Sequence, residues 1–235
     1  MHATIQPPAD LPLAVSLRRV VVLAAVAGYV EVIGFMDVGG IYPGIMTGNT
    51  VQLGMTFAKA QWARFGLIAF AVGLFFVGGI ISSLIKRHLR RPPLELLVMA
   101  GILFVASVVR LHASVRIPVE LPLLALAMAM QGETIATFGG VSLQTIVVTN
   151  NMVKFSDALV GRYLLGPAGQ QSLKVPELKE VLMPGLAWLS YSVGAGAGAT
   201  AAAWLQLPLL VPAVMLVFIV ADLLFTRRAA VGMAR

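Results

Sequence analysis

The sequence predicts an all-α integral membrane protein that consists of two four-segment repeats. Two properties of its composition and one pattern support this prediction: 59% of the residues are hydrophobic, only 11% are charged, and two Gly-rich segments in the two halves resemble each other. Soluble proteins carry about 25% charged residues. A soluble chain of 235 residues cannot bury this much apolar surface in one core. We therefore expect most of the chain to lie in a lipid bilayer.

Apolar segments follow one another along the chain, and polar or Pro-rich stretches separate most of them. Eight segments are expected, at 20–36, 42–58, 64–85, 94–112, 119–136, 141–159, 184–205 and 208–226. The first four form repeat one (20–112) and the last four form repeat two (119–226), which contains an extra loop at 166–180. Residues 1–19 and 227–235 are expected to be cytoplasmic tails, and the first of these has no convincing cleavage site.

The second and the sixth segments contain a backbone break and a polar cluster. A glycine pair lies just ahead of each segment, Gly39–Gly40 in the first copy and Gly139–Gly140 in the second. The polar clusters that follow contain Thr47, Gly48, Asn49, Thr50 and Gln52 in the first copy and Thr149, Asn150 and Asn151 in the second. Hydrocarbon cannot satisfy free backbone groups, so such breaks are tolerated only inside protein or beside a cavity. We therefore expect two interrupted or re-entrant Gly-rich helices.

The polar clusters predict a binding site for a small polar or anionic solute. Thr47 or Asn49 would cap a half-helix that runs from Thr50 toward Lys59. The N-terminus of such a half-helix presents free N–H groups and a partial positive charge, which attract anions. The alternative left open is a polar clamp between helices that binds no ligand.

Three acidic residues lie within or at the ends of the predicted spans: Glu31, Asp37 and Glu133. Carboxylates at membrane depth are costly and usually face a cavity or a partner. Glu31 and Glu133 each precede a glycine pair by six to eight residues, so each can approach the interrupted segment of its own copy. A protonatable acid at this position would couple transport to protons, and Glu31 is the first candidate. The alternative is a carboxylate that only accepts hydrogen bonds from Thr and Asn side chains.

The number of membrane crossings is left open between six and eight. If the two interrupted segments do not cross, the basic run at 86–91 lies in the cytoplasm, and if all eight segments cross, it lies outside. The two topologies place equally many Lys and Arg residues inside. Six crossings are favoured because the four basic residues of this run are hard to translocate. Three crossings per copy invert the second copy, and inverted repeats with interrupted helices are typical of secondary transporters.

Other classes of function find little support in the sequence. The chain has no cysteine, and His2, His88 and His112 are far apart, so we expect no disulfide, no metal site and no cofactor. No motif of a hydrolase, a metalloprotease or a nucleotide-binding enzyme is present, and we expect that the protein is not an enzyme. The net charge of +7 arises mostly from basic residues between apolar segments, which favours anionic lipid over nucleic acid as the partner.

Small residues elsewhere in the spans predict close helix packing rather than a binding site. Gly73 with Gly78–Gly79 is one such group, and the stretch SVGAGAGATAAA at 192–203 is another. Small residues let two helix backbones approach each other closely in a membrane.

The run AGYVEVIGFMDVGGIYPGIMTGNTVQLG contains Glu31, Gly34–Phe35, the first glycine pair, MTGN at 46–49 and Leu53–Gly54. It resembles the N-terminal signature of the YoaK-like family of bacterial multi-pass membrane proteins, a domain of unknown function (DUF). The family usually has Asp at the position of Glu31. In the second signature, Gly132 stands where the family usually has Asn and Asn150 where it has Gly, and Glu133 is not a family feature. The resemblance covers nearly the whole chain and implies a bacterial inner-membrane protein, without implying a substrate.

These observations together predict a secondary transporter or permease for a small polar or anionic solute, coupled to protons through the buried acid. The expected partners are membrane lipid and that solute, and a homo-oligomer is left open. The alternative is a non-transporting membrane scaffold, or a module that binds lipid or another protein. The two alternatives differ in geometry, because the two Thr–Asn clusters of a transporter should converge on one cavity, whereas those of a scaffold can lie apart.

Overall fold

The computed structural model describes residues 12–89, 92–135, 137–164 and 175–233, and most of these residues are helical. The longer helices are α1 (Leu13–Asp37), α2 (Met46–Ala58), α3 (Trp62–Leu89), α4 (Pro92–Val109), α5 (Leu121–Thr134), α6 (Val148–Leu159), α8 (Leu178–Trp204) and α9 (Leu210–Met233). Short elements join some of them: η1 (Ala113–Val115), η2 (Arg116–Glu120), η3 (Val160–Leu164), and the strands β1 (Thr137–Phe138) and β2 (Val141–Ser142).

Several of these helices have the length and the composition of membrane spans. Among the described residues, three are long and apolar enough to cross a bilayer: Leu13–Asp37, Trp62–His88 and Ala113–Gly132. Two shorter apolar helices lie at Pro93–Val109 and Leu210–Thr226. The expectation of a helical protein is therefore confirmed, and the length and composition of these helices support the expected membrane location.

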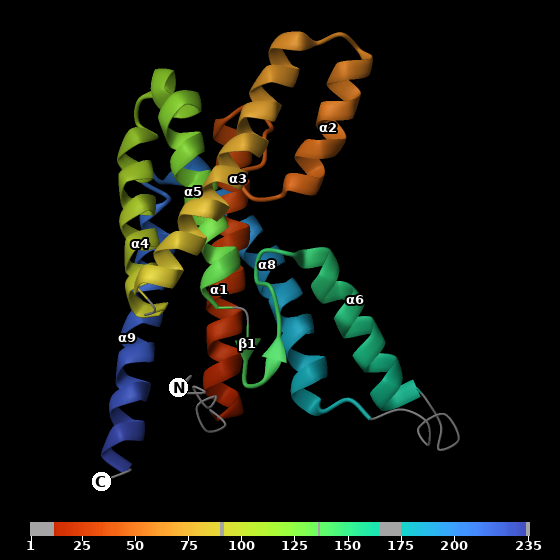
Figure 1. The fold of residues 1–235 in the computed structure, drawn as a ribbon, viewed down its shortest axis with the longest axis vertical. Coiled ribbons are helices and arrows are strands. Elements are labelled where there is room, and N and C mark those ends of the chain that lie inside the picture. Colours follow the sequence, from red (N-terminus) through yellow and green to blue (C-terminus); the bar gives the residue numbers. More distant parts are fainter. Residues whose placement is uncertain (1–11, 90–91, 136, 165–174, 234–235) are drawn as a thin grey trace.

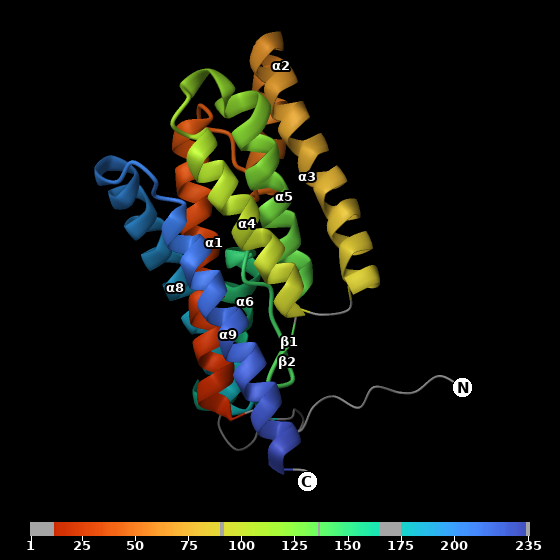
Figure 2. The ribbon, with the colours of Figure 1, turned by 90° about the vertical axis from the view of Figure 1, so that its left-hand side faces the viewer.

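The helices run in two opposite directions along the long axis of the molecule (Figure 1). α1, α4 and α8 run one way, whereas α3, α5 and α9 run the other way. Consequently α1 begins and α9 ends at the same end of the molecule, which a view from the side also shows (Figure 2). α2 and α6 differ from the other helices, because both begin near the middle of the long axis and run toward opposite ends (Figure 1).

The two halves of the chain are interlocked. α1 packs along α8, and α3 packs along α5, so the first helix of each half lies against a helix of the other half. α4 and α9 pack against each other, while α2 lies against α3 and α6 lies against α8. The main hydrophobic core is formed by buried residues of α1, α4, α5, α8 and α9.

Glycines make the contact between α1 and α8 unusually close. A Cβ atom at Gly194 would lie 2.2 Å from the carbonyl oxygen of Ala25, and one at Gly28 would lie 2.1 Å from that of Tyr191. No side chain fits at such distances, so only glycine allows the two backbones to pack this closely. Gly196 lies on another side of α8, where a Cβ would meet nothing within 4 Å. The packing role expected for 192–203 thus belongs to particular glycines of the stretch.

The structure differs most from the predicted boundaries at the two interrupted segments. α2 begins at Met46 rather than at 42, and α6 begins at Val148 rather than at 141. Ahead of α6 the chain forms a hairpin in which Val141 pairs with Phe138, which the sequence did not predict. α8 begins at Leu178, six residues before the expected 184, because Glu177 and Glu180 form a capping box there. The loop expected at 166–180 lies mostly outside the described residues.

Candidate functional site

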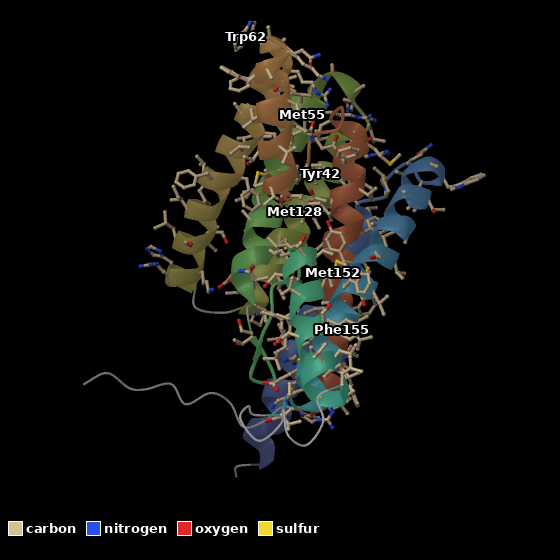
Figure 3. The ribbon with its side chains drawn as sticks, turned by 90° about the vertical axis from the view of Figure 1, so that its right-hand side faces the viewer. Tyr42, Met55, Trp62, Met128, Met152 and Phe155 are labelled. Carbon is tan, nitrogen blue, oxygen red and sulfur yellow. The ribbon has the colours of Figure 1, made fainter. Side chains whose placement is uncertain are left out.

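Two short helices, α2 and α6, begin inside the molecule at neighbouring levels of its long axis (Figure 1). α2 has 13 residues and α6 has 12, which correspond to about 20 Å and 18 Å of helix. Both lengths fall short of the roughly 30 Å of a hydrocarbon core. In Figure 3, Met128 of α5 lies between Tyr42, just ahead of α2, and Met152 in the first turns of α6. The starts of the two helices and this part of α5 form the candidate site.

The glycine pairs ahead of these helices have the backbone conformation that glycine tolerates best. All four residues have positive φ angles: 70° at Gly39, 81° at Gly40, 51° at Gly139 and 83° at Gly140. Side chains are rare in this region of φ, whereas glycine enters it at little cost. Each pair therefore ends one extended or helical stretch and redirects the chain toward the following short helix.

Two buried asparagines hold the segments ahead of α2 and α6 in place. The Asn49 side chain donates to the carbonyl oxygen of Tyr42 at 2.7 Å and accepts from the Tyr42 N–H at 3.0 Å. The Asn151 side chain donates to the carbonyl oxygen of Gln144 at 2.9 Å. Both side chains are almost fully buried. Asn49 does not cap α2, which begins at Met46 with no side-chain cap, but it fixes Tyr42 outside the helix.

A second pair of side chains makes matching contacts further along the two short helices. Gln52 donates to the carbonyl oxygen of Gly40 at 3.0 Å, and Lys154 donates to that of Ser142 at 2.7 Å. Donor and acceptor are separated by 12 residues in both cases. The contacts of Asn49 and Asn151 likewise both span 7 residues. The two segments are therefore tied back to their own helices by the same pattern of hydrogen bonds.

The threonines of the predicted clusters lie on the outer side of the short helices. Thr47, Thr50 and Thr149 are exposed, whereas Asn150 is half-buried. The Thr50 hydroxyl donates to the carbonyl oxygen of Met46 at 2.8 Å. Gly48 lies against the ring of Tyr42, so a Cβ there would come within 3.0 Å of two ring carbons. The predicted clusters are thus divided, with the asparagines facing inward and the threonines facing outward.

Glu31 of α1 is the acid that contacts the start of α2. Its Oε1 atom accepts hydrogen bonds from the backbone N–H of Gly44 at 3.1 Å and of Ile45 at 2.9 Å. The side chain is only 3% exposed, and its Oε2 atom has no hydrogen-bond partner in the described part of the chain. The carboxylate therefore lies at the positive end of the α2 dipole. Tyr191 of α8 lies within electrostatic range of both Glu31 and Tyr42.

The surroundings of Glu31 leave little space. A Cβ atom at Gly44 would lie 2.7 Å from Oε2 of Glu31 and 2.9 Å from Cε of Met128. Position 44 must therefore be glycine for the carboxylate to reach the backbone of the segment ahead of α2. Met128 of α5 covers the same place from the other half of the chain.

Gln131 of α5 is a site residue that the prediction missed. It follows Glu31 by 100 residues, the same offset that separates Gly39 from Gly139, and that offset is the signal that could have identified it. Its side-chain N–H donates to the carbonyl oxygen of Leu23 at 2.5 Å and to the hydroxyl of Thr145 at 3.3 Å. Its carbonyl oxygen is buried and has no partner among the described residues. Glu133, the predicted acid of this half, has a side chain outside what the structure describes.

Asp37 lies in an ionic cluster at the end of α1 rather than at the start of α2. Arg110 pairs with it at 2.5 Å and Arg116 at 3.2 Å. Arg116 also lies 3.9 Å from Glu120, whose side chain is fully buried. These charges join the end of α1 to the connection between α4 and α5. A coupling role for Asp37 stays a prediction, but its carboxylate already has two cationic partners.

The fold and these short interior helices define a class of protein: a multi-helix membrane protein with two helices that start within its interior. Residues 20–221 match the family model described as a protein of unknown function (DUF1275). This match covers most of the chain, and the chain therefore belongs to that family.

A curated relative supports the same assignment. The chain is 26% identical over 181 residues to the UPF0700 transmembrane protein YoaK of Bacillus subtilis (strain 168), covering 74% of this chain and 78% of that protein. No solved structure matches the chain. The resemblance to the YoaK-like family is confirmed, and the membrane character of the chain has support from a relative as well as from its helices.

Proposed function

We propose that this protein is a secondary transporter for a small polar or anionic solute, with its binding site between the starts of α2 and α6. The observation that carries the proposal is that both helices begin near the middle of the long axis and run toward opposite ends (Figure 1). In membrane transporters, half-helices of this kind direct their N-terminal N–H groups at the anionic part of a substrate. A permease of this type needs no enzymatic residues and no cofactor.

Two inverted repeats and six crossings are part of this proposal. The matched hydrogen bonds of Asn49 with Asn151 and of Gln52 with Lys154 support a repeat, as do the two glycine pairs. The opposite directions of α2 and α6, and of α1 and α5, support an inverted arrangement (Figure 1). Three long helices in each half would then cross the bilayer, while α2 and α6 would each reach only to its middle.

The orientation we propose places both termini in the cytoplasm of a bacterial cell, at its inner membrane. α1 and α8 begin and α9 ends at one end of the molecule (Figure 1), and basic residues lie near these helix ends: Arg18, Arg19, Lys179, Arg227 and Arg228. Loops on the cytoplasmic side carry an excess of Lys and Arg. In the described part of the chain, four basic residues lie toward the opposite end: Lys59, Arg64, Arg110 and Arg116.

Glu31 is the coupling acid in this proposal, because it is the titratable group that touches the start of α2. While the carboxyl group is ionised, its Oε1 atom accepts hydrogen bonds from the N–H groups of Gly44 and Ile45. A proton on the carboxyl group weakens these charge-assisted hydrogen bonds and makes the N–H groups available to an anion. Tyr191 of α8 is a titratable group near Glu31, while α5 contributes the uncharged Met128. One proton would thus accompany one solute anion.

Proton flux into liposomes tests the proposal. The purified protein is reconstituted with a pH-sensitive dye inside, and inorganic phosphate, sulfate, succinate and glutamate are added outside one at a time. We expect at least one of them to acidify the lumen with the wild type and none with Glu31→Gln. Glu95→Gln is the matched control, because Glu95 of α4 is also 3% exposed and should be dispensable for the flux.

Thermal stability provides a second measurement on the same protein. A solute at a hundred times its Kd stabilises the folded state by about 2.7 kcal/mol, which raises the melting temperature by several degrees. If no tested solute drives proton entry and none raises the melting temperature, these solutes are not substrates. If flux occurs but is equal in the wild type and in Glu31→Gln, the coupling role of Glu31 is wrong.

A second candidate function, a non-transporting membrane scaffold, is favoured by the contacts of Asn49. Both polar groups of this side chain bond to Tyr42 within its own segment, as a structural clamp requires. The exposed threonines of α2 and α6 would then face lipid or a partner protein. The liposome measurement with the Asn49→Ala variant distinguishes the two functions. A scaffold predicts lower thermal stability and no solute-driven flux in any variant, the wild type included.

A further inference from the structure

A groove of about 640 Å³ runs along one face of α3. Its wall is a stripe of residues at helical spacing, formed by Val72, Phe75, Phe76, Gly79, Ile80 and Leu84. These residues are spaced three and four apart, so they share one face of the helix. The volume lies within the range of small-molecule sites in proteins.

Two neighbouring glycines of α3 have different surroundings, and this difference creates the groove. A Cβ at Gly78 would lie 3.3 Å from Ala129 and Leu126 of α5, so Gly78 lets the two helices pack. A Cβ at Gly79 would meet nothing within 4 Å, so Gly79 opens into the groove. A larger residue at position 79 would fill this space without disturbing the contact with α5.

The groove is apolar along its length and cationic at one end. Ser83 and Arg87 line the groove in the last turns of α3, and Met46, the first residue of α2, lines it as well. From Val72 to Arg87 the helix rises by about 22 Å, which exceeds the roughly 15 Å of one leaflet of the hydrocarbon core. An amphiphile with an anionic head at Arg87 and a chain that reaches the middle of the bilayer matches both the length and the charge.

A second copy of the protein matches the groove less well. Copies in one membrane share the same orientation, so a two-fold contact through this face would bring the two Arg87 side chains together. Like charges placed opposite each other oppose association. The charge of the groove therefore favours an anionic lipid over another copy.

We propose that the groove binds an anionic phospholipid, with its phosphate at Arg87 and one acyl chain along the stripe from Leu84 to Val72. The inner end of the chain reaches Met46, so the bound lipid lies next to the start of α2. This site does not depend on the transport proposal, because it uses α3 and not the polar groups around Glu31.

Native mass spectrometry of the purified full chain tests the proposal, with phosphatidylglycerol and phosphatidylcholine of identical acyl chains as probes. We expect the wild type to retain phosphatidylglycerol about fivefold more than phosphatidylcholine. Gly79→Leu should reduce retention of phosphatidylglycerol about tenfold. The matched control is Gly73→Leu, since Gly73 lies on the same helix, also meets nothing within 4 Å, and does not line the groove.

Two further variants separate the head group from the chain. Arg87→Gln should remove the preference for phosphatidylglycerol, whereas Lys86→Gln, with the same loss of charge outside the groove, should leave it intact. Ile80→Ser places a polar group in the stripe without adding volume and should weaken retention of both lipids. Equal lipid retention by Gly79→Leu, Ile80→Ser and the wild type would overturn the proposal. A change from dimer to monomer in Gly79→Leu with lipid retention unchanged would instead assign the groove to a second copy.

Discussion

The starts of α2 and α6 share the same backbone design but differ in the side chain that faces them from α1 or α5. Each helix follows a glycine pair with positive φ, and each is tied back by an asparagine and by a second polar side chain. At α2, the Glu31 carboxylate accepts hydrogen bonds from two backbone N–H groups. At the matching position of the other half, Gln131 bonds instead to Leu23 and Thr145.

This difference indicates how two similar half-sites can have separate tasks. A carboxylate satisfies donors and can carry a proton, whereas a carboxamide has a fixed charge of zero. Glu31 can therefore change its charge where it faces the start of α2, whereas Gln131 at the matching position cannot. If a solute binds between the two starts, Gln131 presents an uncharged group to it and Glu31 presents one whose charge can switch. A single proton-carrying acid is what this asymmetry supports.

The largest expected effect comes from removing the acid. Glu31→Leu leaves the N–H groups of Gly44 and Ile45 buried without acceptors, and we expect a loss of about 3 kcal/mol in stability. Gln131→Leu removes the hydrogen bonds that the Gln131 side chain donates to Leu23 and to Thr145. We expect it to lower the stability by about half as much. The measurement is thermal unfolding in detergent, followed by tryptophan fluorescence. Equal losses in the two variants would show that the two starts do not differ in the way described.

The next effect concerns the space around the acid. Gly44→Ala places a Cβ 2.7 Å from Oε2 of Glu31, and we expect a loss of about 2 kcal/mol, since overpacking in a core costs 1–3 kcal/mol. Gly54→Ala is the matched control, because Gly54 lies in the same short helix and its Cβ would meet nothing within 4 Å. There we expect a gain of about 0.5–1 kcal/mol from helix propensity. A stable Gly44→Ala would mean that Glu31 can move away from α2.

Much of the fold could be predicted because membrane helices are long apolar runs. The interruption of two segments was also predictable, because glycine pairs and polar clusters inside apolar runs indicate a break in the helix. The hairpin of Phe138 and Val141 could not be predicted, since strands of two residues have no periodicity. The sequence predicts that the small residues around Gly194 pack closely against another helix. It does not identify α1 as that helix, because the partner is set by tertiary contacts that no local pattern contains.

The candidate site was predicted in its location but not in the direction of its side chains. The positions of Asn49 and Asn151 were found from the repeat, whereas their inward orientation follows from backbone groups that only the fold brings near them. The expectation that Thr47 or Asn49 caps the helix was wrong, because α2 begins at Met46, before Thr47. Gln131 was not predicted because its side chain is uncharged, although it follows Glu31 by the same 100 residues that separate Gly39 from Gly139.

The smallest effect distinguishes the two asparagines. Asn49 makes two hydrogen bonds with Tyr42, whereas Asn151 makes one with Gln144. The side-chain oxygen of Asn151 has no partner among the described residues. Each bond contributes about 1 kcal/mol, so we expect Asn49→Ala to cost about 2 kcal/mol and Asn151→Ala about 1 kcal/mol. Thermal unfolding of the two variants checks this difference of about 1 kcal/mol. If Asn151→Ala were the more harmful variant, the Asn151 side chain would contribute more to stability than its one hydrogen bond to Gln144, and the two asparagines would not differ in the way described.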